Sequence, residues 1–156
     1  KTLKGLKIAW IGDGNNVCNS MIYGAALSGA KMSIATPKGF EPNKSTVKVS
    51  QNLTDIELTT DPLKAAENAD VVVTDTYSSI HNDDSKRIKK FIPKYQVNDK
   101  IMDLAKKNAI FLHCLPAKRD QEVTSSVIDG PQSVVWDEAE NRLHSQKALL
   151  CALLHA

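Results

Sequence analysis

The stretch KIAWIGDGNN (residues 7–16) decides the fold. Its apolar first half predicts a buried strand over 7–12 that ends at a glycine, and the polar DGNN turn leads into a helix predicted over 16–28. Gly29 ends that helix. A buried strand followed at once by a helix is the opening unit of a parallel α/β sheet, so we expect this unit to repeat along the chain.

The repeat continues to the end of the sequence. Further strands are predicted over 32–36, 56–60, 70–76, 109–114 and 133–136. Helices are predicted over 44–53, from the Asp61–Pro62 start signal onward, and over 84–91, 99–107 and 138–155. This alternation predicts a doubly wound parallel α/β sheet, Rossmann-like, in three α/β/α layers. The 156 residues suit one domain.

Composition excludes several classes of protein. The hydrophobic fraction is 42%, the charged fraction is 24% and the net charge is +2, with no basic cluster interleaved with aromatics, so nucleic acid is not an expected partner. The apolar run ALLCALL (148–154) is too short to span a membrane. Because the first residue is Lys1 and a strand follows almost at once, we expect a chain trimmed from something longer.

The cysteines indicate a reducing location. Cys18, Cys114 and Cys151 form no CxxC pair, so we expect neither a disulfide framework nor a structural zinc site. A cytoplasmic protein fits this pattern, or one of the mitochondrial matrix if the source is eukaryotic. Cys18 and Cys151 lie on apolar faces of predicted helices and are expected to be packing residues.

Polar residues gather where the predicted strands end. GDGNN (12–16), DTYSS (75–79) and HCLP (113–116) each follow an apolar strand, and DEAENR (137–142) follows the last one. Ligands of doubly wound sheets bind at the carboxyl ends of the strands. We therefore expect the functional site at this edge.

GDGNN resembles a dinucleotide fingerprint only in part. Val17 stands where the third glycine belongs, and no acidic residue follows at the required distance, so a nucleotide site is disfavoured. Two readings remain open: a tight turn made by Gly12 and Gly14, or an Asn15 or Asn16 that caps the helix and offers its amide to a polar ligand.

Asp75 and Arg142 also have two readings each. Asp75 either caps the turn after its strand or presents a carboxylate to a cationic amine. Arg142, in the first turns of the last helix, is either a solvated side chain or a partner of the helix N-terminus in holding an anion such as phosphate. The KRIKK run (86–90) is interpreted as a solvated helix face.

His113 and Cys114 invite a comparison with cysteine nucleophiles. Neighbours in a strand point to opposite faces, so the two side chains make a poor base–nucleophile pair. His81, His144 and His155 show no metal-ligand spacing with carboxylates, and no metal or cofactor is expected.

Taken in order, the motifs resemble the ornithine carbamoyltransferase family. WIGDGNN, ATPKGFEPN, DVVVTDTYSS, FLHCLPA and EAENR run collinearly over nearly the whole chain. The match covers the family's second, amino-acid-binding domain. The Ser-Thr-Arg-Thr and His-Pro-x-Gln motifs of its carbamoyl-phosphate domain do not occur in these 156 residues. The resemblance implies an ornithine-binding domain over 1–156, with the carbamoyl-phosphate domain absent from this chain.

The resemblance also implies roles for particular residues. Asn16, Asp75, Ser79 and Ile80 would bind ornithine, while Cys114, Leu115 and Arg142 would meet carbamoyl phosphate. Asp75, Cys114 and Arg142 would be the catalytic residues, with no covalent intermediate. The intact enzyme would be a homotrimer assembled mainly through the other domain.

One departure keeps the acceptor open. The chain reads DTYSSIH, so Ile80 and His81 stand where the family usually has Met-Gly. Putrescine or an acylated ornithine is an alternative acceptor, and a non-catalytic small-ligand-binding module is the alternative from another class. The helix KALLCALLHA is apolar nearly all round, so we expect it to pack on the missing domain and to leave an exposed patch in this chain.

Overall fold

A computed structural model describes residues 2–78 and 85–155. Its strands are β1 (Lys7–Ile11), β2 (Lys31–Ala35), β3 (Ile56–Thr59), β4 (Val71–Thr74) and β5 (Ile110–His113). Its helices are α1 (Asn16–Ser28), α2 (Lys44–Ser50), α3 (Pro62–Ala66), α4 (Ser85–Ile88), α5 (Asp99–Leu104), α6 (Ser125–Ile128) and α7 (Val135–Leu154).

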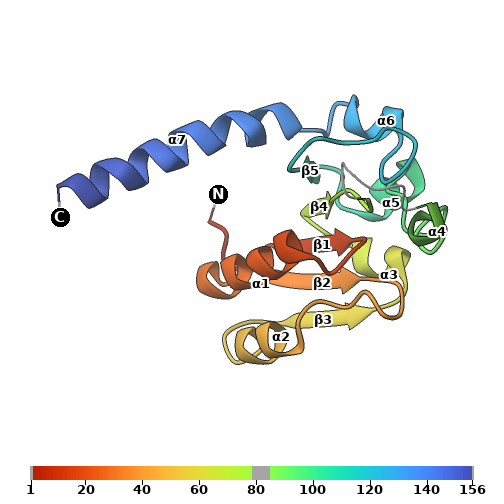
Figure 1. Cartoon of the computed structure of the whole chain (residues 1–156), viewed down its shortest axis with the longest axis horizontal. Coiled ribbons are helices and arrows are strands. Elements are labelled where there is room, and N and C mark those ends of the chain that lie inside the picture. The colour runs from red at the N-terminus through yellow and green to blue at the C-terminus, as the bar shows by residue number, and fades with distance from the viewer. Residues whose placement is uncertain (1, 79–84, 156) are drawn as a thin grey trace.

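The five strands form one parallel sheet in the order β3-β2-β1-β4-β5 (Figure 1). The chain builds outward from β1 to β3, then crosses back to place β4 on the other side of β1. Strand order therefore reverses between β1 and β4, and such a switch point leaves a crevice at the carboxyl ends of the two strands. The predicted doubly wound α/β architecture is confirmed.

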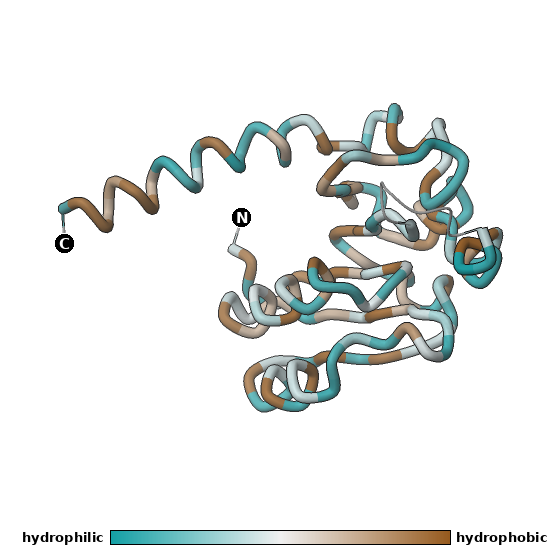
Figure 2. Tube along the Cα trace, viewed as in Figure 1, coloured by the Kyte–Doolittle hydropathy of each residue, from teal (hydrophilic) through white to brown (hydrophobic). Residues whose placement is uncertain are grey.

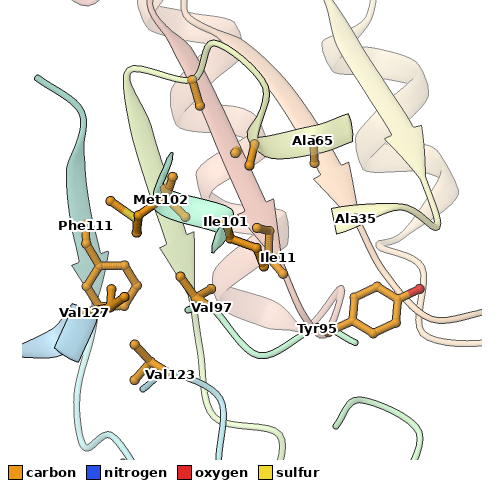
Figure 3. Packing of buried hydrophobic residues seen from close by; sticks show 14 of the residues in the cluster. Ile11, Ala35, Ala65, Tyr95, Val97, Ile101, Met102, Phe111, Val123 and Val127 are labelled. Atoms are coloured by element: carbon orange, nitrogen blue, oxygen red, sulfur yellow. The ribbon is translucent and has the colours of Figure 1, made fainter. Parts of the chain in front are cut away.

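Two hydrophobic clusters cover the two faces of the sheet. On one face, Trp10 and Ile34 pack against Cys18 and Ile22 of α1 and Val47 of α2. The opposite face packs against α3, α5 and α6 (Figure 3). Its buried side chains include Ile11, Ala35, Ala65, Val97, Ile101, Phe111 and Val127. Helices on both sides of the sheet give the three-layer arrangement.

Capping residues fix both ends of α1 and the start of α3. Asn15 caps α1 by accepting hydrogen bonds from the backbone N–H groups of Val17 and Cys18, and Gly29 ends it in the left-handed conformation, with φ 72°. Asp61 caps α3 through the N–H of Leu63. The start of α1 is thereby fixed directly beside the end of β1.

The strand predicted over 133–136 is wrong. Ser133 forms an isolated parallel bridge with Phe111, and the N–H of Val134 donates to the Phe111 carbonyl at 3.1 Å. The chain then enters α7 at Val135, three residues before the predicted helix start. A short apolar run suits either state, and here it continues into the long helix that follows.

Helix α7 extends away from the sheet, as Figure 1 shows. Val135 is its buried residue, and the rest of the helix is exposed to differing degrees. Its apolar residues recur along the projecting end in Figure 2 and include Leu143, Leu149, Leu150, Leu153 and Leu154, each at least 59% exposed. The expected exposed patch is therefore present. The packing role predicted for Cys151 does not hold in this chain because Cys151 is exposed, whereas Cys18 is buried as predicted.

Over the described ranges, every helix is too short or too polar to cross a bilayer.

Candidate active site

The switch point between β1 and β4 holds a cavity of about 380 Å³. In the described part of the chain it is lined by the loop after β1 with the first residue of α1, by the loop after β4, and by α4. The lining residues are Asp13, Asn15, Asn16, Asp75, Thr76, Tyr77, Ser78 and Arg87. Two of the polar strand ends predicted from the sequence thus meet at one cavity.

Two glycines allow the loop after β1 to sit close to its neighbours. Gly12 has φ 138°, and a methyl group on it would lie 2.9 Å from Cε1 of Tyr77. A methyl group on Gly14 would lie 2.6 Å from the carbonyl oxygen of Phe40. The tight-turn reading of these glycines is therefore right, and it holds alongside the capping role of Asn15.

Asp75 is the centre of a network of neutral donors. Its Oδ2 accepts from Nδ2 of Asn15 at 2.7 Å, and its Oδ1 accepts from the N–H of Thr76 at 2.7 Å and from the thiol of Cys114 at 3.3 Å. The residue is buried, although it faces the cavity. None of these donors carries a positive charge that would balance the carboxylate. Asp75 is therefore suited to receive a cationic amine.

Cys114 is a protonated thiol in this arrangement. Burial of the sulfur and the adjacent Asp75 carboxylate raise the pKa of Cys114 to about 12. The residue as a whole is exposed, but its sulfur is turned toward Asp75. A thiol with such a pKa is neither a nucleophile nor a base at neutral pH, which agrees with the prediction against a Cys–His dyad.

His113 belongs to a buried hydrogen-bond network with Leu115 and Glu122, although one of its ring nitrogens lies within 4.8 Å of the Cys114 sulfur. Its Nδ1 accepts from the N–H of Leu115 at 2.9 Å, so its Nε2 carries the proton and lies 3.2 Å from Oε1 of Glu122. The same Glu122 oxygen accepts from the N–H of Lys118 at 2.7 Å. His113 and Glu122 are fully buried, and Leu115 has a φ of 54°. These bonds hold the HCLP corner in its left-handed bend.

Asp75, His113 and Cys114 place one potential metal-ligand atom each within 4.8 Å of one another. The donor set is unsuited to a metal because both ring nitrogens of His113 already serve Leu115 and Glu122. The Cys114 thiol would also have to lose its proton against a raised pKa.

The start of α7 is tied to the same edge of the sheet. Oε2 of Glu138 accepts from the N–H of His113 at 2.9 Å, and burial raises the pKa of Glu138, with the His113 hydrogen bond opposing that rise. Arg142 lies one turn further along α7, is exposed, and does not line the cavity beside Asp75. Leu115 lines a separate apolar cavity of about 300 Å³ with Trp136.

The predicted ornithine-binding residues are placed in part. Asn16 and Asp75 line the same cavity. Ser79 and Ile80 lie outside the described residues, as does His81. Among the predicted residues, the structure therefore gathers Asn16, Asp75 and Cys114 and leaves Arg142 apart.

Sequence reasoning missed an ion pair at the cavity. Arg87, interpreted as part of a solvated helix face, is half-buried and forms an ion pair with Asp13. The pair joins positions 74 residues apart, so no local pattern signals it. Asp13 belongs to the GDGNN motif, but only the folded structure shows that Arg87 is its partner.

A parallel α/β domain with a cavity at its switch point, lined by carboxylates and amides, defines a class of small-ligand-binding domain. Residues 4–153 match the family model for the aspartate/ornithine carbamoyltransferase Asp/Orn-binding domain. The chain belongs to this family and corresponds to its Asp/Orn-binding domain.

Relatives of known name agree with this assignment. The chain is 62% identical over 151 residues to an ornithine carbamoyltransferase of Cenarchaeum symbiosum, covering 97% of this chain and 50% of that protein. It is 50% identical over 153 residues to that of Methanocaldococcus jannaschii, covering 94% and 50%. The solved structure of ornithine carbamoyltransferase from Pyrococcus furiosus matches with a TM-score of 0.90 and 46% identity, over 96% of this chain and 50% of that one. The chain thus spans about half the length of the curated relatives it matches.

Proposed function

We propose that this chain is the ornithine-binding half of a carbamoyltransferase. The complete protein would move a carbamoyl group from carbamoyl phosphate to the side-chain amine of ornithine, giving citrulline and phosphate for arginine biosynthesis. The observation that carries the proposal is the meeting of Asn16, Asp75 and Cys114 at the switch point of a chain that belongs to this family.

The cavity suits the amino-acid head of ornithine. The Asp75 carboxylate, held by neutral donors, would receive the α-ammonium group, and the Asn16 amide would donate to the α-carboxylate. We also propose that Ser79 and Ile80 complete this site, as the family resemblance implies.

The reaction requires a neutral amine. A side-chain ammonium with a pKa of ~10.4 has no free electron pair at neutral pH, so the site must favour the deprotonated form by partial desolvation. The amine nitrogen would form a bond to the carbonyl carbon of carbamoyl phosphate, the bond from that carbon to the phosphate oxygen would break, and the amine would lose a proton to solvent or to the departing phosphate.

Cys114 would lie beside the reacting amine as a neutral thiol. Its raised pKa argues against both proton acceptance and covalent catalysis by sulfur. Leu115, held next to it by His113, would shape the junction of the two substrates. Arg142 would reach carbamoyl phosphate from α7 and stabilise charge on the leaving phosphate once the other half of the protein is in place.

The rest of the protein would supply the carbamoyl-phosphate domain and the trimer contacts. The exposed leucines of α7 would pack on that domain. We propose a reducing compartment, the cytoplasm or the mitochondrial matrix, because all three cysteines are free thiols.

An acceptor panel tests the proposal on the full-length protein that contains this chain. Carbamoyl transfer from carbamoyl phosphate is measured with ornithine, putrescine, N-acetylornithine and aspartate at equal concentrations. We expect citrulline from ornithine and little product from the others. Transfer to another amine would overturn ornithine as the acceptor, and no transfer to any of them would leave a binding module.

A further inference from the structure

Arg87 bridges the two strand ends that form the switch point. From α4, its guanidinium forms an ion pair with the carboxylate of Asp13 after β1, and its Nε donates to the carbonyl oxygen of Tyr77 after β4 at 2.8 Å. A planar group with donors in fixed directions is suited to joining two acceptors in this way.

Aromatic rings hold the guanidinium in place. The Arg87 Cζ lies 4.8 Å from the centroid of the Phe40 ring and 5.8 Å from that of Phe91. The side chain of Arg87 is 37% exposed and that of Asp13 is 12% exposed, and both residues line the cavity. Cation–π contacts of this kind add to the ion pair and restrict its geometry.

Among the residues that the structure describes, two carboxylates with opposite surroundings line the cavity. Asp75 is held by neutral donors, whereas Asp13 has a cation as its partner. Burial raises the pKa of Asp13 and the nearby Asp75 raises it further, while Arg87 lowers it. Within residues 2–78 and 85–155, the groups facing Asp13 are Arg87 from α4, Asp75 after β4 and the buried Cys18 thiol of α1.

Without Arg87, a ligand with a positive group would meet two carboxylates rather than one. We propose that Arg87 is a positioning residue for the ligand: by pairing with Asp13 it directs an ammonium group to Asp75. This inference rests on the proposed function because it takes the ammonium group of an amino acid as the ligand. Asp13 is then a structural partner of Arg87, and Asp75 is the carboxylate that binds.

Three variants of the full-length protein test the role of Arg87. Arg87→Met removes the cation, Arg87→Lys keeps the charge without the planar fork, and Arg87→Met combined with Asp13→Asn removes both charges. The matched control is Lys31→Met, which breaks an exposed ion pair with Asp55 at the opposite, amino edge of the sheet.

For Arg87→Met we expect the KM for ornithine to rise on the order of tenfold, with kcat changed much less, a difference that corresponds to about 1.4 kcal/mol. The defect should shrink as the pH is lowered, because the pKa of Asp13 is raised by burial, loss of Arg87 raises it further, and protonation of Asp13 removes the competing charge. The double variant should recover most of the KM and lose this pH dependence, and Arg87→Lys should keep the wild-type pH profile. Lys31→Met should leave both parameters unchanged.

An unchanged KM in Arg87→Met would overturn the proposal. So would a double variant as impaired as the single one, because Arg87 would then act other than through Asp13. Thermal unfolding gives a readout that needs no substrate: the double variant should be more stable than Arg87→Met. If the wild-type protein carbamoylates no ornithine, the proposed function fails, and the unfolding comparison still decides whether Arg87 compensates Asp13.

Discussion

Slow alkylation of Cys114 is expected from its raised pKa. At pH 8 an ordinary thiol of pKa ~8.5 is about one quarter thiolate, whereas a thiol with a pKa of about 12 is about one part in ten thousand. The thiolate population therefore falls about 2,000-fold. The greater nucleophilicity of the more basic thiolate, with a Brønsted coefficient of ~0.4–0.5, returns about 25- to 60-fold of that loss. The net expectation is a rate about 40- to 100-fold below that of an ordinary thiol.

The assay is iodoacetamide labelling of the full-length protein, followed peptide by peptide by mass spectrometry between pH 6.5 and pH 10.5. The rate at Cys114 should rise about tenfold per pH unit to the top of this range, while an ordinary thiol levels off near pH 9. The denatured protein supplies the ordinary rate for the same peptide.

Asp75→Asn separates the causes of the raised pKa. Removing the carboxylate should lower the pKa of Cys114 and speed its labelling at pH 8, although burial of the sulfur should keep it slower than the denatured reference. Asp55→Asn, at an exposed carboxylate near the opposite edge, should change nothing. A plateau near pH 8.5 in the wild-type protein would refute the reasoning, because the thiol would then be free of Asp75.

Three further outcomes can be checked by unfolding measurements. Gly14→Ala should destabilise the protein by about 3 kcal/mol or more in denaturant titrations, because the added methyl group overlaps the backbone of segment 40–42 and that backbone must move. Glu122→Leu should cost about 1–3 kcal/mol, because it leaves the buried Nε2–H of His113 without an acceptor; the N–H of Lys118, which also loses its acceptor, is only partly buried. Glu122→Gln keeps an acceptor oxygen and should cost clearly less, and equal losses would contradict the buried network. The pKa of Cys114 is higher in the folded protein than in the unfolded chain, so the folded protein keeps a proton that the unfolded thiol releases. Its contribution to the free energy of unfolding is therefore present below pH ~8.5 and is lost as the pH rises toward 12. Cys114→Ser should weaken the fall of the free energy of unfolding at alkaline pH.

Much of the fold was accessible from the sequence because its boundaries carry chemical signals. Helix α1 begins after Asn15 and ends at Gly29, as predicted, because a capping amide and a left-handed glycine act locally. The run over 133–136 carries no such signal. Residues 135 and 136 of this run form the first residues of α7, because the long helix begins at Val135.

The candidate site was predictable only as far as its residues follow strands. Asn16, Asp75 and Cys114 each stand at a strand end, so a parallel sheet brings them to one edge. Arg87 stands in a run of lysines on a short helix, and its partner Asp13 is distant in sequence. Pairing between distant residues depends on tertiary packing, which a local pattern does not encode.

We propose that Asp75 binds the amino-acid substrate of a carbamoyltransferase at the β1–β4 switch point. The most direct measurement is the steady-state rate of citrulline formation by the full-length protein and its Asp75→Asn and Asp55→Asn variants. We expect Asp75→Asn to lose kcat/KM for ornithine by about 100-fold or more, the size expected when a charged hydrogen-bond partner of the substrate is removed, and Asp55→Asn to match the wild type. Equal activity of the two variants would contradict it.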